Sequence, residues 1–167
     1  ATVIAQHRPS LLVGVTGHPA TFTRDMIDTM TNAHERPIVM PLSNPTVFAE
    51  ATPTDILTWS KGKAIVATGS PFEPVLVDGT TRVVGQANNL FIFPGMGLGT
   101  IVSRASTITT GMFLAAAEAL STFVGLDMLR AGSLYPPITR VREVSRSVAL
   151  AVAAQAAAEG VAQPLAD

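Results

Sequence analysis

The 167-residue sequence contains no cysteine, little charge and no long apolar run, and each absence excludes a class of protein. Without cysteine there is no disulfide framework, zinc–thiolate site or cysteine nucleophile. No apolar stretch approaches the roughly 20 residues that a transmembrane helix needs. The formal net charge of −1 gives no electrostatic basis for binding nucleic acid or anionic lipid. We therefore expect neither nucleic acid nor membrane as a partner, and the lack of cysteine agrees with a cytoplasmic location.

Charged side chains make up only 14% of the sequence, against roughly 25% in a typical soluble domain. A chain with so little charge cannot cover its own surface with charged groups. The sequence begins at Ala1 without methionine, and residues 1–7 lack the charged-then-apolar pattern of a secretory signal. We therefore expect a piece of a longer protein, with apolar surfaces that meet the rest of that protein or neighbouring subunits.

Three short apolar runs, at residues 10–15, 37–42 and 64–68, alternate with helical patterns. Thr23 is placed to cap a helix over residues 24–33, and Thr52 precedes a second helix from Pro53 to about Ser60. Strands that alternate with helices predict a parallel sheet. Residues 75–77 and 82–84 flank Asp78-Gly79, which predicts a hairpin at the edge of that sheet.

The second half of the sequence has helical periodicity. Thr109 is placed to cap a helix whose apolar residues recur at helical spacing, and four valines mark one face of a long helix that ends at Gly160: Val141, Val144, Val148 and Val152. The predicted fold class is α/β, part of a Rossmann-like doubly wound parallel sheet with a hairpin, followed by a C-terminal helical segment. Residues 1–105 would form the C-terminal half of a dinucleotide-binding domain, and residues 106–167 a helical layer and C-terminal tail of the same unit.

Small polar residues follow each of the three predicted strands. They are Gly14-Val15-Thr16-Gly17, Ser43-Asn44-Pro45-Thr46 and Gly69-Ser70-Pro71. Ligands of open parallel sheets bind beyond the carboxyl ends of the strands, and these groups can form hydrogen bonds to a sugar, an amide or a carboxylate. The same residue types are also ordinary turn formers, so the residues alone support a binding edge and a set of plain turns about equally.

Asn88 and Asn89 are the most distinctive polar pair in the sequence. Neutral amides suit the orientation of a hydroxy acid or a nicotinamide ribose, but they cannot act as a base near neutral pH. An asparagine turn explains the pair equally well.

The remaining candidates favour structural roles. The spacing Gly95-x-Gly97-x-Gly99 lacks the full dinucleotide pattern and favours close helix packing or a tight helix start. The three histidines share no metal-ligand spacing, and Tyr135 lies between Leu134 and Pro136, where packing is favoured over acid–base chemistry. No nucleophile–base–acid set can be assembled, so the sequence offers no candidate catalytic residue and no metal ligand.

Taken together, these motifs resemble the malic enzymes. The similar segments are Glu35-Arg36-Pro37-Ile38-Val39-Met40-Pro41-Leu42-Ser43-Asn44-Pro45-Thr46, Trp59-Ser60-Lys61-Gly62-Lys63-Ala64, Gly69-Ser70-Pro71-Phe72, Gly85-Gln86-Ala87-Asn88-Asn89, Phe91-Ile92-Phe93-Pro94-Gly95 and Leu134-Tyr135-Pro136-Pro137 followed by Val141-Arg142. They keep the family's order from about Arg8 to Gln155. Ala87, where the family usually has glycine, and the loop from Gly14 to Phe22 depart from the common pattern.

The resemblance implies a dinucleotide cofactor and a substrate. Malic enzymes convert malate to pyruvate and CO₂ with NAD or NADP and a Mg or Mn ion. Carried over residue by residue, the resemblance gives substrate binding to Asn44, Asn88 and Asn89. It gives cofactor binding to Gly14, Val15, Thr16, Gly17, Ser43, Asn44 and Asn89.

The resemblance covers only the C-terminal, NAD(P)-binding part of such an enzyme. The family's tyrosine–lysine pair, its metal-binding acids and its glycine-rich dinucleotide loop correspond to positions before Ala1. The chain alone is therefore expected to be inactive, to need the missing N-terminal half and to belong to a homo-oligomer. Two alternatives stay open: part of a malolactic enzyme, which yields lactate, or a non-catalytic interaction or regulatory module. The choice between NAD and NADP is also open.

Overall fold

The computed structural model describes residues 2–163, which form two compact units. The first, here called the sheet unit, contains residues 2–87 and 126–135, and the second, the helical unit, contains residues 88–125 and 136–163. The change from one unit to the other falls after residue 87, earlier than the predicted division after residue 105, and residues 126–135 return to the sheet unit. Ala1 and residues 164–167, the end of the predicted tail, lie outside the described residues.

Four parallel strands form the centre of the sheet unit, in the order β1-β2-β3-β6. They are β1 (Leu11–Gly14), β2 (Ile38–Pro41), β3 (Ile65–Thr68) and β6 (Gly85–Gln86). The three predicted strands and the Rossmann-like α/β class are confirmed. The short strand β6 joins the sheet because Gly85 pairs with Ala67 and Gln86 with Thr68.

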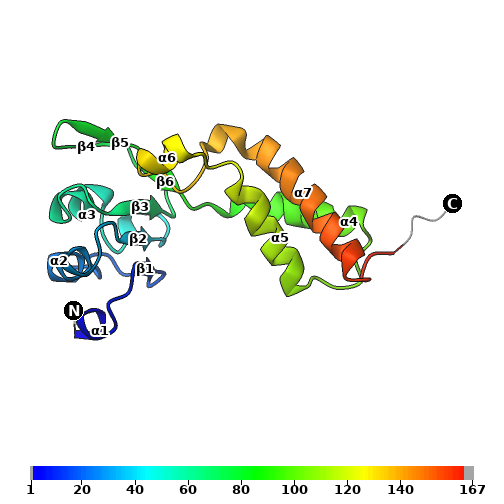
Figure 1. Cartoon of the computed structure of the whole chain (residues 1–167), viewed down its shortest axis with the longest axis horizontal. Helices are drawn as coiled ribbons and strands as arrows, with labels where there is room; N and C mark the ends of the chain where they lie inside the picture. The colour runs from blue at the N-terminus through cyan, green and yellow to red at the C-terminus, as the bar shows by residue number, and fades with distance from the viewer. Residues whose placement is uncertain (1, 164–167) are drawn as a thin grey trace. The chain divides into compact units, whose positions relative to one another are not determined.

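Two helices lie on the same side of these strands (Figure 1). Helix α2 (Arg24–Ala33) begins where the Thr23 side chain accepts a hydrogen bond from the Met26 amide, and α3 (Pro53–Trp59) where Thr52 accepts one from the Asp55 amide. Both caps and both helices are confirmed. Helix and strand side chains share one core: Phe22, Ile27, Met30, Val39, Ile56, Leu57 and Val66 are among its members. The helices α1 (Thr2–His7) and α6 (Leu126–Arg130) complete the unit and were not predicted.

The hairpin forms a two-stranded sheet of its own instead of an edge of the parallel sheet. Its strands are β4 (Val75–Val77) and β5 (Thr80–Arg82), so the prediction of a second strand at 82–84 was wrong. Asp78 and Gly79 both have positive φ, at 49° and 74°, as a two-residue type I′ turn requires. A turn this short pairs Val77 directly with Thr80.

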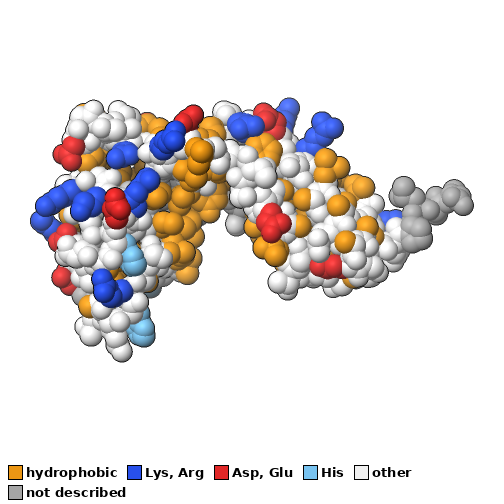
Figure 2. Space-filling view, in the orientation of Figure 1, with side chains coloured by type: hydrophobic (Ala, Val, Ile, Leu, Met, Phe, Trp, Pro, Cys, Tyr) orange, Lys and Arg blue, Asp and Glu red, His pale blue; other side chains and the backbone are white. Residues whose placement is uncertain are grey.

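The face of the parallel sheet opposite α2 and α3 carries exposed apolar side chains. Leu11 and Val13 alternate along β1 and are 46% and 47% exposed. Figure 2 shows hydrophobic side chains gathered on this part of the sheet unit. Parallel sheets normally have both faces covered, so this face is a surface that another polypeptide segment could cover.

The helical unit is built around α7 (Val141–Ala158), against which α4 (Phe93–Val102) and α5 (Thr110–Ser121) pack. The short helices η2 (Asn89–Phe91) and η3 (Ile138–Arg140) belong to the same unit, and η1 (Thr46–Phe48) to the sheet unit. Val144, Val148 and Val152 are fully buried, which confirms the predicted valine face.

The glycines of α4 allow it to approach α7 closely. A Cβ atom at Gly95 would lie 2.6 Å from the Ser145 carbonyl oxygen, and one at Gly99 would lie 2.6 Å from that of Ala149. The prediction of close helix packing is therefore confirmed for Gly95 and Gly99, whereas a Cβ atom at Gly97 would meet nothing within 4 Å. None of the helices among residues 2–163 combines the length and the apolar character needed to cross a membrane.

Candidate functional site

The carboxyl ends of β1, β2 and β3 bring three predicted loops together at one edge of the sheet. Backbone hydrogen bonds continue past the strands, from the Leu42 amide to the Gly14 carbonyl (2.8 Å) and from the Gly69 amide to the Pro41 carbonyl (3.2 Å). As a result, the residues predicted to bind the cofactor after β1 lie beside Ser43 and Asn44 after β2. We call residues 14–17, 43–44 and 69–70 the strand-end loops.

Glu50 is the buried centre of these loops, with no exposed surface. Its carboxylate oxygen Oε1 accepts hydrogen bonds from the Thr16 amide (2.7 Å), the Thr16 hydroxyl (2.9 Å) and the Ser43 hydroxyl (2.5 Å). The Ser43 amide donates to Oε2 at 3.4 Å. Ser43 Oγ in turn accepts a hydrogen bond from the Gly17 amide at 2.9 Å. One carboxylate therefore joins the loop after β1 to the loop after β2.

The hydrogen bonds keep Glu50 ionised in its buried position. Burial by itself would raise the pKa of this carboxyl group, because it disfavours the charged form. The hydrogen bonds from Ser43 and Thr16 outweigh burial and lower the pKa from 4.5 to about 2. Glu50 is consequently an anion at neutral pH and has no role as a proton donor there.

Glycine at position 14 makes room for this carboxylate. A Cβ atom at Gly14 would lie 2.6 Å from Glu50 Cδ and 2.7 Å from Phe22 Cζ. The backbone carbonyl of Glu50 also accepts a hydrogen bond from the Phe22 amide at 3.0 Å. Glu50 thus holds both ends of the exposed segment between Val15 and Phe22.

Asn44 stands at the exposed side of the same edge and precedes a cis peptide bond to Pro45. Its side-chain oxygen accepts a hydrogen bond from the hydroxyl of Ser70, which follows β3. The Ser70 carbonyl accepts a hydrogen bond from the buried Thr68 hydroxyl at 2.8 Å. The amide of Asn44 is therefore held by the third strand-end loop while its residue remains open to solvent.

Asn88 and Asn89 belong to the helical unit. The Asn88 side-chain oxygen accepts a hydrogen bond from the Leu90 amide at 2.9 Å and caps η2. Asn89 is the first residue of η2, and it is exposed. Asn88 therefore performs the turn role that the sequence allowed, whereas the Asn89 side chain is open to a ligand.

The described residues contain no gathering of three or more histidine, cysteine, aspartate or glutamate side chains that could hold a metal ion. The side chains of residues 2–163 therefore do not fit a metal site. Burial raises the pKa of the Tyr135 hydroxyl, which moves it further from a value useful for acid–base catalysis near neutral pH.

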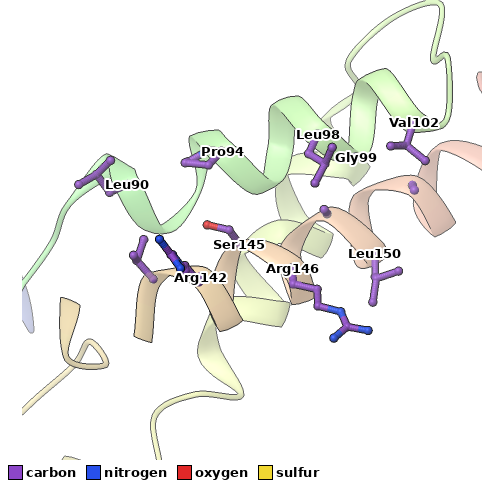
Figure 3. A pocket seen from close by; sticks show the side chains of 12 residues that line it. Leu90, Pro94, Leu98, Gly99, Val102, Arg142, Ser145, Arg146 and Leu150 are labelled. Atoms are coloured by element: carbon purple, nitrogen blue, oxygen red, sulfur yellow. The ribbon is translucent and has the colours of Figure 1, made fainter. Parts of the chain in front are cut away.

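An apolar groove of about 560 Å³ lies between α4 and α7 in the helical unit (Figure 3). Leu98, Val102 and Leu150 contribute to its lining, and Arg142 and Arg146 come from α7. The lining is almost wholly apolar, so it lacks the convergent donors and acceptors that orient a polar ligand. We therefore place the candidate small-molecule site at the strand-end loops and treat this groove as a packing surface.

Sequence reasoning missed Glu50. The residue lies between the buried alanines Ala49 and Ala51 in the segment that joins η1 to α3. Its side-chain partners are 7 and 34 residues away in the sequence. No local spacing indicates such a contact. The available signal was chemical, since a carboxylate seven residues after Ser43 is a candidate acceptor for the hydroxyl and amide donors of that predicted loop.

Comparison with known proteins shows which family this chain is similar to. A family described as "Malic enzyme, NAD binding domain" matches residues 1–157. An NAD-dependent malic enzyme of Shewanella piezotolerans is 47% identical over 165 residues, which cover 99% of this chain and 29% of the relative. One of Sodalis glossinidius is 49% identical over 160 residues, covering 96% of this chain and 28% of the relative. The chain thus spans less than a third of the length of these relatives.

Solved structures agree with this assignment. The malic enzyme of Pyrococcus horikoshii superposes with a TM-score of 0.71 at 31% identity, covering 94% of this chain and 32% of that one. The Entamoeba histolytica malic enzyme superposes with a TM-score of 0.75 at 29% identity, covering 93% of this chain and 29% of that one.

Proposed function

Because this chain belongs to the malic enzyme family, through its NAD-binding domain, we propose that it supplies part of the dinucleotide and substrate site of an enzyme that decarboxylates malate oxidatively to pyruvate and CO₂. The observation that carries the proposal is the convergence of the strand-end loops, because ligands of parallel α/β sheets bind at that edge. The full reaction needs groups that are not among the residues described here.

The cofactor of the proposed site is NAD or NADP, and NAD is favoured by the names of the relatives. The bound dinucleotide would accept the hydride that leaves C2 of malate. Gly14, Val15, Thr16 and Gly17 would line its nicotinamide side, with Ser43, Asn44 and Asn89 as further cofactor contacts. The edge suits a nicotinamide ribose because it offers small residues, backbone groups and neutral amides, and none of these contacts adds a charge.

The substrate contacts of the proposal are Asn44, Asn88 and Asn89. An amide can donate to a carboxylate and accept from a hydroxyl, which are the two groups that malate offers. Asn44 and Asn89 are exposed, and we assign the malate carboxylate or hydroxyl to Asn89, with Asn88 beside it. These side chains orient the substrate and move no proton.

The acid–base groups and the Mg or Mn ligands would come from an N-terminal remainder of the enzyme. Support comes from the short share of the relatives that this chain covers and from the exposed apolar sheet face at Leu11 and Val13. The apolar groove between α4 and α7 is a second surface of this kind. We propose that the remainder or a neighbouring subunit of a homo-oligomer covers both surfaces.

A chimeric enzyme tests the proposal. In it, this chain replaces the matching segment of the Shewanella piezotolerans enzyme, and malate-dependent NAD reduction is measured with Mn²⁺. We expect turnover by the chimera, pyruvate as the product, and no turnover by the 167-residue chain alone. Lactate as the product would instead favour a malolactic enzyme. A folded chimera with neither activity would favour a non-catalytic module, and turnover by the chain alone would contradict the need for a remainder.

Asn89→Ala in the chimera tests the substrate assignment. Loss of a hydrogen bond to the charged carboxylate should raise KM for malate about tenfold or more. KM for NAD should rise by a clearly smaller factor, because the cofactor contact proposed for Asn89 involves a neutral group. Asn32→Ala, an exposed amide at the end of α2, serves as the control and should change neither constant. An unchanged KM for malate in Asn89→Ala would refute the assignment.

A further inference from the structure

The Glu50 carboxylate is a buried charged group for which the proposed reaction has no chemical use. It lies between the loops after β1 and β2 and accepts its hydrogen bonds from Thr16 and Ser43. It has no exposed surface, so a ligand at the sheet edge cannot reach it. Its effect on a ligand must therefore pass through the residues that it holds.

The polar groups of Thr16 and Ser43 turn inward toward this carboxylate. Thr16 donates both its amide and its hydroxyl to Glu50, and its carbonyl accepts a hydrogen bond from His18 Nδ1 at 2.7 Å. Ser43 Oγ lies between the Gly17 amide and Glu50. These two residues therefore shape the edge, at which the neighbouring residues Val15 and Asn44 are exposed.

The Glu50 side chain packs closely against the end of β1 at Gly14. Glu50 Cδ and Cγ lie within 2.6 and 2.7 Å of where a Cβ atom of Gly14 would be, so the side chain fills the space against the strand end. Hydrogen bonds to an ionised acceptor are about twice as strong as those between neutral groups. The charge thus fixes the loop positions more firmly than a neutral side chain of the same shape would.

We propose that Glu50 is a positioning residue of the dinucleotide site: it fixes the loop after β1 against the loop after β2 and does not contact the dinucleotide. The inference rests on the proposed function for the identity of the ligand. The coupling of the two loops rests on the hydrogen bonds alone.

The first measurement needs only the 167-residue chain. Glu50→Gln keeps the size of the side chain, removes its charge and replaces an acceptor with a donor. Amide hydrogen exchange, read by NMR, should become about tenfold or more faster at Thr16 and Ser43, corresponding to the loss of one charge-assisted hydrogen bond. Exchange in α7 should not change. Ile56→Val, which trims the core of the same unit, is the control and should not loosen these two amides selectively.

The second measurement uses the chimeric enzyme. Glu50→Gln should raise KM for NAD about tenfold, with KM for malate and kcat changed much less, whereas Ile56→Val should leave the ratio of the two KM values unaltered. Ser43→Ala combined with Glu50→Gln should raise KM for NAD less than the product of the two single effects, because both act through one network.

The outcomes separate the two ideas. An inactive but folded parent chimera contradicts the proposed function, and unchanged exchange at Thr16 and Ser43 in Glu50→Gln overturns the positioning role. Faster exchange with an unchanged KM for NAD also overturns it, because loop order would then not matter to the ligand. Faster exchange together with a selective rise in KM for NAD supports the inference.

Discussion

Glu50 is a single residue whose ionisation should be visible in the stability of the protein. Its folded pKa of about 2 lies below its ordinary value of 4.5, so the unfolded chain binds its proton first as the pH falls. The stabilising contribution is therefore complete above about pH 4.5 and is lost progressively toward pH 2. Its full size is about 3 kcal/mol, from the difference between the two pKa values.

Urea unfolding of the wild-type chain and of Glu50→Gln at several pH values tests this prediction. The free energy of unfolding of the wild type should exceed that of the variant most at neutral pH, and the difference should shrink between pH 4.5 and pH 3. Other carboxyl groups titrate in both proteins and cancel in the comparison. A difference that stays constant over this range would contradict the lowered pKa.

Single residues also show what local sequence can predict. The caps at Thr23, Thr52 and Thr109 were predictable because each hydroxyl bonds an amide only three residues ahead. Glu50 was not predictable, because its contact with Thr16 spans 34 residues and depends on the packing of β1 against β2. The residues of the strand-end loops were predictable because they directly follow apolar runs. Glu50, which joins two of these loops, follows no such run.

At the scale of elements, the contact between α4 and α7 predicts opposite effects on stability for alanine substitutions at two glycines of α4. A Cβ atom at Gly99 would lie 2.8 Å from Val152 Cβ, whereas one at Gly97 would meet nothing within 4 Å. Gly99→Ala should therefore lower the free energy of unfolding by about 1 to 3 kcal/mol through overpacking. Gly97→Ala should raise it by about 0.5 to 1 kcal/mol, because alanine favours a helix interior.

Both variants can be compared by urea unfolding followed by far-ultraviolet circular dichroism. The two substitutions are the same chemical change two positions apart, so each is the control for the other. Equal effects of the same sign would mean that α4 does not approach α7 at Gly99 as closely as the structure shows.

Elements differ in how far the sequence determines them. Helices α2, α3 and α7 have caps or a continuous apolar face, and their predicted bounds were close to those observed. Strand β6 contains two residues and exists because Gly85 and Gln86 pair with β3, so no periodicity can indicate it. The second hairpin strand begins at Thr80, two residues before its predicted start, because the two-residue turn sets the register and pairs Val77 with Thr80.

At the scale of the whole molecule, the shortage of charge agrees with the apolar surfaces that each unit exposes. Leu98 and Leu150 of the groove are 52% and 65% exposed. Apolar grooves of this kind promote association in water. The isolated chain should therefore show concentration-dependent self-association in sedimentation velocity experiments.

Lysine substitutions locate the surface responsible. Leu150→Lys or Leu98→Lys should reduce the self-association, because a charge at the groove opposes burial of the apolar lining. Leu76→Lys changes a leucine of the hairpin that is 72% exposed and lies outside the groove, so it should have little effect. If Leu76→Lys reduced association as much as Leu150→Lys, the groove would not be the associating surface.

The shared oxygen of Glu50 also bears on how the sequence can change over evolution. Thr16 and Ser43 both donate to Oε1, and Gly14 leaves the space that this side chain fills. A substitution at any one of these four positions alters the requirements at the other three, so drift at one should be followed by compensating change at the others. We therefore expect positions 14, 16, 43 and 50 to covary in an alignment of homologues.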